Sequence, residues 1–98
     1  MSEVRRDENK TIVKFDKDLV ASVVPEIKQE LKEIIEQGED IAVDLQNVGM
    51  VDSKGIGLLI ATHNHLQENN KSLEVLNPSE DVISLFKSMR LDKHFRIS

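Results

Sequence analysis

The sequence predicts an α/β fold in which a partly parallel sheet packs against helices, in one domain over residues 1–98. A length of 98 residues is typical of a single domain. Segments rich in β-branched residues alternate along the chain with segments whose apolar residues recur at helical spacing. The resulting order, β-β-α-β-α-β-α-β, indicates one antiparallel pair at the start, followed by right-handed parallel crossovers.

The chain begins with a predicted hairpin. Residues 11–15 (Thr-Ile-Val-Lys-Phe) are rich in β-branched side chains and predict a strand. A second strand around residues 3–6 pairs with it through a turn at residues 7–10.

A helix is predicted over residues 21–37. Pro25 suits its first turn, where the missing N–H is not needed, and Gly38 is a typical stop. The apolar positions recur at helical spacing, as Ile27, Leu31, Ile34 and Ile35.

The second half of the chain contains two further β-α units. Residues 40–45 are almost continuously apolar, which predicts a strand buried on both faces. A helix follows over residues 53–68, then a strand over residues 72–76. Ser79 is a good N-cap for a last helix, and residues 94–98 predict a final strand. The apolar face of the last helix comprises Val82, Ile83, Leu85, Phe86 and Met89.

The helix over residues 53–68 carries two histidines. Its apolar face comprises Ile56, Leu59, Ile60, His63 and either Leu66 or Gln67. We expect His63 at the edge of the core with a satisfied hydrogen bond, and His65 in solvent. Because the two rings are two residues apart on a helix, they should not bind one metal ion together.

The composition excludes several classes of protein. The formal net charge is −5, from 18 acidic and 13 basic residues, which argues against general binding of nucleic acid or anionic membranes. The absence of cysteine excludes disulfides and thiol catalysis. The polar N-terminus lacks a signal sequence, and no apolar run could cross a bilayer, so we expect a cytoplasmic protein. No cofactor or metal site is predicted.

The stretch Val-Asp-Ser-Lys-Gly-Ile-Gly at residues 51–57 resembles several catalytic motifs without matching one. A dinucleotide-binding fingerprint would need glycine at Ile60, and a nucleophile elbow would need glycine at Val51. The glycine-lysine-serine order of a phosphate-binding loop is reversed here. A serine hydrolase is not favoured either, because no general base can be assigned to Ser53.

The same stretch has features of a binding surface. Asp52 or Ser53 can cap the helix, but Gly55 and Gly57 each cost about 1 kcal/mol relative to alanine. Glycine here lets another backbone approach, either a neighbouring strand or a partner protein. A phosphate on Ser53 would be stabilised by the positive end of the helix, so the fold could tolerate it. It would also add negative charge beside Asp52 on the exposed surface, which indicates a switch in partner binding rather than in fold.

The run VDLQNVGMVDSKGIGLLIATHNHL resembles the signature of the STAS domain, and most closely that of the single-domain anti-sigma factor antagonists. Their pattern is a strand ending in Asp-Leu, a short apolar loop, and Asp-Ser-x-Gly-x-Gly-x-Leu at a helix start. The matching residues are Asp44, Leu45, Val48, Asp52, Ser53, Gly55, Gly57 and Leu59.

The resemblance implies a single-domain STAS-like fold with a mixed sheet of 4–5 strands and helices packed largely on one side. It also implies partner switching: an anti-sigma factor that is a serine kinase phosphorylates Ser53, and a PP2C-type phosphatase resets it. The protein would then be a ligand and substrate rather than an enzyme, and a monomer or weak dimer. The implied partner surface comprises Asp18, Asp52, Ser53, Lys54, Gly55 and Gly57.

Two substitutions in the first loop leave the identity of the partner open. Relatives often carry Gly-Asp/Glu-Leu-Asp after the second strand, whereas Lys17 and Val20 flank Asp18 and Leu19 here. The alternative is a constitutive STAS docking subunit of another complex, such as an ABC-type lipid transporter or a signalling scaffold. In that case Ser53 would only cap its helix.

Overall fold

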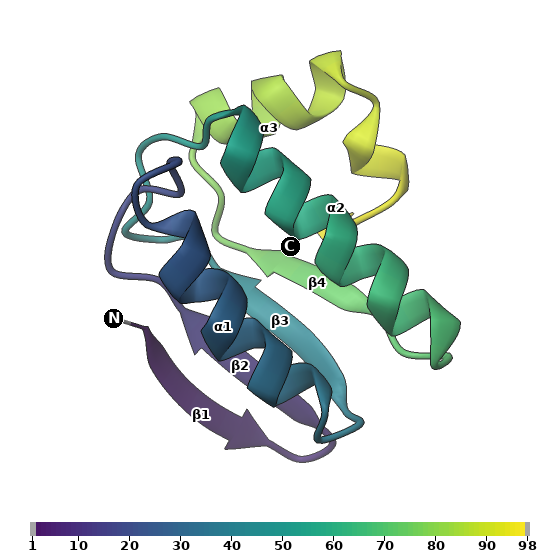
Figure 1. Cartoon of the computed structure of the whole chain (residues 1–98). Helices are drawn as coiled ribbons and strands as arrows, with labels where there is room; N and C mark the ends of the chain where they lie inside the picture. Colours follow the sequence, from purple (N-terminus) through teal and green to yellow (C-terminus); the bar gives the residue numbers. More distant parts are fainter. Residues whose placement is uncertain (1, 98) are drawn as a thin grey trace.

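The computed structural model describes residues 2–97 and contains one mixed sheet (Figure 1). The sheet has five strands in the order of the chain: β1 (Glu3–Asp7), β2 (Lys10–Lys14), β3 (Asp40–Asp44), β4 (Leu73–Leu76) and β5 (Arg96–Ile97). The pair β1–β2 is antiparallel, and the other three pairs are parallel.

The helices form a second layer. They are α1 (Val24–Ile35), α2 (Ser53–Glu68) and α3 (Glu80–Ser88), with a short 3-10 helix η1 (Leu91–Lys93) before β5. Because each crossover joins neighbouring parallel strands in the same sense, the helices gather on one face of the sheet (Figure 1). This confirms the predicted α/β fold with helices on one side.

The central strand β3 is buried on both faces, as its apolar sequence predicts. Ile41 and Val43 belong to the core, with exposures of 1% and 0%. Ala42, which points to the other face, is also fully buried. An ion pair of 3.1 Å between Lys10 of β2 and Glu74 of β4 spans β3 on this second face.

Helix α1 begins later than predicted. Residues 20–23 form a turn, in which the Val23 N–H donates to the Val20 carbonyl at 2.9 Å. The helix starts at Val24, with Pro25 in its first turn as expected. Gly38 follows the helix in the left-handed conformation, with φ of 76°, which confirms the predicted stop.

The C-terminal elements are shorter than predicted. Ser79 caps α3 by accepting from the Val82 N–H at 3.2 Å, but Met89 lies at the C-cap and is 47% exposed. Arg90 then takes a left-handed conformation, and η1 occupies the next residues. The final strand is therefore limited to residues 96–97, and Ser98 lies outside the described residues.

Helix α2 is buried along more than the predicted face. Ile56, Leu59 and Leu66 are buried as expected, and the choice between Leu66 and Gln67 falls on Leu66. Leu58 and Thr62 are also buried, because α1 packs along this second side of α2.

Candidate functional site

Two loops lie side by side at the carboxyl ends of β2 and β3. Leu19 in the first loop pairs with Val51 in the second as an isolated parallel bridge. The Leu19 N–H donates to the Met50 carbonyl at 3.0 Å, and the Asp52 N–H donates to the Leu19 carbonyl at 3.1 Å. Both Leu19 and Val51 are buried, so the backbone of each loop is anchored to the core.

Two carboxylates add reciprocal ties between these loops. One oxygen of Asp18, Oδ1, accepts from the N–H groups of Gly49 at 2.8 Å and Met50 at 3.2 Å. In the other direction, Oδ2 of Asp52 accepts from the Ala21 N–H at 2.8 Å. Each loop thus satisfies backbone donors of the other.

Asp52 is also the N-cap of α2. Its Oδ1 accepts from the Gly55 N–H at 2.9 Å, and its backbone is extended, as N-cap residues usually are. The hydrogen bond from Gly55, followed by that from Ala21, lowers the pKa of Asp52 from its ordinary value of 3.8. The carboxylate is therefore ionised at neutral pH.

Ser53 is the first residue of α2 and is exposed. Because Asp52 caps the helix, Ser53 does not, and its hydroxyl makes no hydrogen bond to any residue between 2 and 97. Lys54, the next residue, is exposed as well. The two candidate capping residues are thus distinct in structure: one carboxylate holds the helix start and one hydroxyl is free in solvent.

The two glycines of the helix start have different environments. A Cβ on Gly55 would lie 2.2 Å from the Leu19 carbonyl oxygen and 2.9 Å from Val51 Cγ1. Gly55 therefore permits the close approach of the chain's own loop. A Cβ on Gly57 would meet nothing within 4 Å, and Gly57 is exposed. Packing within the described chain explains Gly55 and leaves Gly57 available to another molecule.

Sequence reasoning missed Met50. Its side chain is 57% exposed on the second loop, while its N–H is held by Asp18. An exposed methionine is a typical contact residue in protein interfaces. The signal was present in the sequence as a large apolar residue in a loop between Gly49 and the buried Val51. We define the helix-start surface as Met50, Asp52, Ser53, Lys54 and Gly57.

His63 lies at the edge of the core, but its expected hydrogen bond is absent. Its Nδ1 is buried and has no partner among the described residues. The ring instead makes edge-to-face contacts with Phe95 at 5.5 Å and His94 at 6.1 Å. Burial, and then the neighbouring His94, lower the pKa of His63 from 6.5.

His65 is exposed, as predicted. Within residues 2–97 no three histidine, cysteine or acidic side chains are close enough to hold a metal ion. Across the same residues, none of the helices is long and apolar enough to cross a membrane.

Comparison with known sequences gives a consistent set of relatives. The STAS domain model matches residues 1–98. The anti-sigma-B factor antagonist of Staphylococcus epidermidis is 37% identical over 75 residues, which cover 76% of this chain and 69% of the relative. The Staphylococcus aureus protein of the same name (strain NCTC 8325 / PS 47) is 37% identical over 76 residues, which cover 76% and 70%.

Solved structures share the fold at lower identity. An anti-sigma factor antagonist from Mycobacterium paratuberculosis has a TM-score of 0.89 and 18% identity, covering 99% of this chain and 83% of that one. The antagonist SpoIIAA has been solved unphosphorylated, with a TM-score of 0.78 and 18% identity, covering 100% and 87%. The phosphorylated Bacillus SpoIIAA has a TM-score of 0.77 and 19% identity, covering 100% and 91%. The chain thus belongs to the STAS domain family and, within it, to the anti-sigma factor antagonist family.

Proposed function

We propose that the unmodified protein binds an anti-sigma factor that is also a serine kinase, and that phosphorylation of Ser53 by this kinase ends the complex. The observation that carries the proposal is the free, exposed hydroxyl of Ser53 at the start of α2. The family assignment supports it, as does the existence of SpoIIAA in a phosphorylated form. In this proposal the protein is a ligand and substrate in the cytoplasm, not an enzyme, and a PP2C-type phosphatase resets it.

The electrostatics of the helix start explain how one phosphate would act. A phosphoserine carries about −1.5 to −2 charges at neutral pH, and the N-terminus of a helix stabilises negative charge. The fold should therefore tolerate the modification. A partner seated on the helix-start surface would instead meet this charge beside the ionised Asp52. The phosphate would thus reduce binding without requiring a change of fold.

The proposed roles on the helix-start surface differ by residue. Ser53 accepts the phosphate, and Lys54 and Met50 contact the partner directly because both are exposed. Gly57 lets the partner's backbone approach α2. Asp18, Asp52 and Gly55 hold the surface in place through the contacts between the two loops.

The direct test is phosphorylation by the cognate kinase. We expect incubation with this kinase and ATP to add a single phosphate, detected by intact mass, and Ser53→Ala to abolish it. Ser84→Ala is the matched control, because Ser84 is also an exposed helical serine but lies on α3. Phosphate still added to Ser53→Ala, or a wild type left unmodified, would contradict the proposal. Recovery of an ABC-type ATPase in place of a kinase would then favour a constitutive docking subunit.

A further inference from the structure

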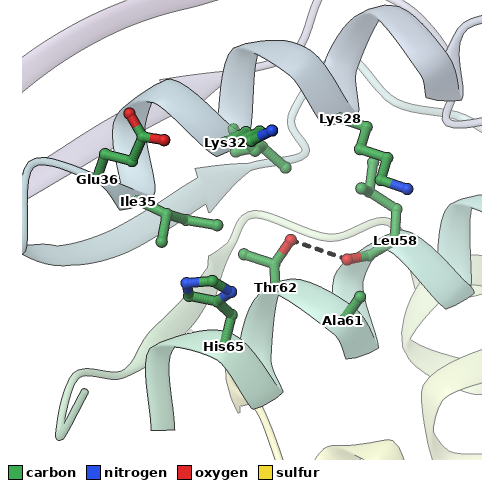
Figure 2. A pocket seen from close by; sticks show the side chains of 9 residues that line it. Lys28, Lys32, Ile35, Glu36, Leu58, Ala61, Thr62 and His65 are labelled. Atoms are coloured by element: carbon green, nitrogen blue, oxygen red, sulfur yellow. Dashed lines mark hydrogen bonds between the residues drawn. The ribbon is translucent and has the colours of Figure 1, made fainter. Parts of the chain in front are cut away.

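A groove runs between α1 and α2, on the side of α2 that sequence analysis did not assign to the core (Figure 2). Its volume is about 310 Å³. Leu31 and Leu58 form its floor and are buried, with exposures of 1% and 6%. The Thr62 hydroxyl donates to the Leu58 carbonyl at 2.8 Å, so the one polar group near the floor is already satisfied (Figure 2). The floor is therefore apolar in character.

The rim of the groove is mainly cationic. Lys28 and Lys32 lie one turn apart on α1, whereas His65 of α2 lies near Ile35 at the other end of the groove (Figure 2). Both lysines are exposed, and neither forms an ion pair with another described residue. Glu36 is the single acidic residue on the rim. On a protein with a net charge of −5, this groove has the opposite local charge.

The groove continues beyond this region. A second hollow of about 390 Å³ shares Ile35, Glu36 and His65 with the first and extends to Lys71. The combined groove is elongated, follows the two helices and is open to solvent. An enclosed cavity would suit a small molecule, whereas an open groove between two helices buries one face of a long ligand.

We propose that the α1–α2 groove binds an acidic amphipathic helix of a partner protein. Apolar side chains of that helix would lie over Leu31 and Leu58, and carboxylates one turn apart would pair with Lys28 and Lys32. The two lysines and the two carboxylates can pair because residues four apart in sequence are neighbours on the surface of an α-helix, both on α1 and on the incoming helix. The exposed Ala61 in the α2 wall leaves room for the incoming backbone.

This site is separate from Ser53. The groove begins at Leu58, more than one helical turn after Ser53, and its cationic rim comes mostly from α1. Binding in the groove should therefore not depend on the Ser53 hydroxyl, so the two proposals can fail independently.

The test uses synthetic peptides and the full chain. The first probe is a set of amphipathic peptides of about 15 residues with leucine at helical spacing and glutamate on the flanks, in several registers. The second set has lysine in place of glutamate, and the third probe is sodium decanoate. Amide chemical shifts would locate each probe, and titration would give its affinity.

We expect an acidic peptide to shift amides of residues 28–36 and 58–65, and the basic peptides not to bind. The double variant Lys28→Glu with Lys32→Glu should weaken binding about tenfold at low salt, because two exposed ion pairs are lost and reversed. Ala61→Leu, which fills the groove from an exposed position, should weaken it as well. The matched control is Lys87→Glu with Lys93→Glu, which reverses two exposed lysines outside the groove and should leave binding unchanged.

Several results would overturn the proposal. Equal binding of acidic and basic peptides would remove the role of charge, and shifts confined to other surfaces would remove the groove. Binding of decanoate alone would identify a site for alkyl anions instead. Ser53→Ala should bind the acidic peptide like the wild type, and loss of binding in that variant would show that the groove is not a separate site.

Discussion

A methyl group on Gly55 would lie 2.2 Å from the Leu19 carbonyl oxygen, whereas a methyl group on Gly57 would meet nothing within 4 Å. We therefore expect opposite effects from the same substitution. Gly55→Ala should lower the free energy of unfolding by about 1–3 kcal/mol or more, because the backbone of the first loop must move. Gly57→Ala should raise it by about 1 kcal/mol, since alanine is the better helix former. Urea denaturation of both variants measures these changes.

The two variants also separate structure from binding. If Gly57 serves a partner, Gly57→Ala should be the more stable protein and the weaker ligand for the kinase. Equal destabilisation by both substitutions would contradict the assignment of Gly55 alone to internal packing.

Residue identity predicted part of this arrangement. The sequence indicated that Asp52 or Ser53 caps α2, but the choice depends on the extended backbone of Asp52 and on the loop that approaches it. The approaching loop contacts Asp52 through Ala21, which is 31 positions away in the chain. Local sequence patterns therefore do not predict this contact. The contact of His63 with His94 was not predicted for the same reason.

At the scale of elements, the hydrogen bonds between the two loops predict different effects on stability for substitutions of Asp52 and Asp18. Asp52 uses both oxygens, one for Gly55 and one for Ala21, so an amide in its place must lose one hydrogen bond. Asp52→Asn should therefore lower the free energy of unfolding by about 1 kcal/mol or more. Asp18 uses a single oxygen for both of its donors, so Asp18→Asn can keep both bonds.

The matched comparison is thus between two Asp→Asn changes on neighbouring loops. Asp18→Asn should change stability by no more than about 0.5 kcal/mol, as most surface substitutions do. Chemical denaturation at neutral pH gives both values. A larger loss in Asp18→Asn than in Asp52→Asn would show that this account of the ties between the loops is wrong.

Elements were predicted well where one signal dominated and less well where tertiary contacts intervened. The apolar run of β3 and the cap at Ser79 each gave the correct element. The predicted start of α1 at residue 21 was wrong. Residues 20–23 form a turn instead, and the Ala21 N–H donates to Asp52 on the other loop. The second buried side of α2 was missed because it depends on where α1 packs.

For the whole molecule, burial of His63 predicts that stability depends on pH. Its folded-state pKa lies below the ordinary value of 6.5, so folding favours the neutral ring. The corresponding stability is fully present above that value and is lost as the pH falls through the lowered pKa. We expect the thermal midpoint to fall on acidification below 6.5. Replacement by leucine, His63→Leu, should remove this dependence.

The exposed His65 provides the control, since His65→Gln should retain the pH dependence of the wild type. Asp52 contributes in a different range, because its pKa is lowered from 3.8 and its contribution is lost only in stronger acid. A pH profile of His63→Leu that matches the wild type between neutrality and this range would rule out His63 as the cause.

The two edges of the sheet affect whether the protein can pair with a strand of another molecule. All five residues of β1 are exposed and four of them are charged, while β5 has only two residues. A strand from a neighbouring molecule would find exposed charged side chains at one edge and few free backbone groups at the other, which disfavours strand addition and aggregation. The helix-start surface and the groove, where the two proposals place binding, both lie in the helical layer. If the protein exchanges partners as proposed, these edges would protect it from irreversible pairing through its sheet.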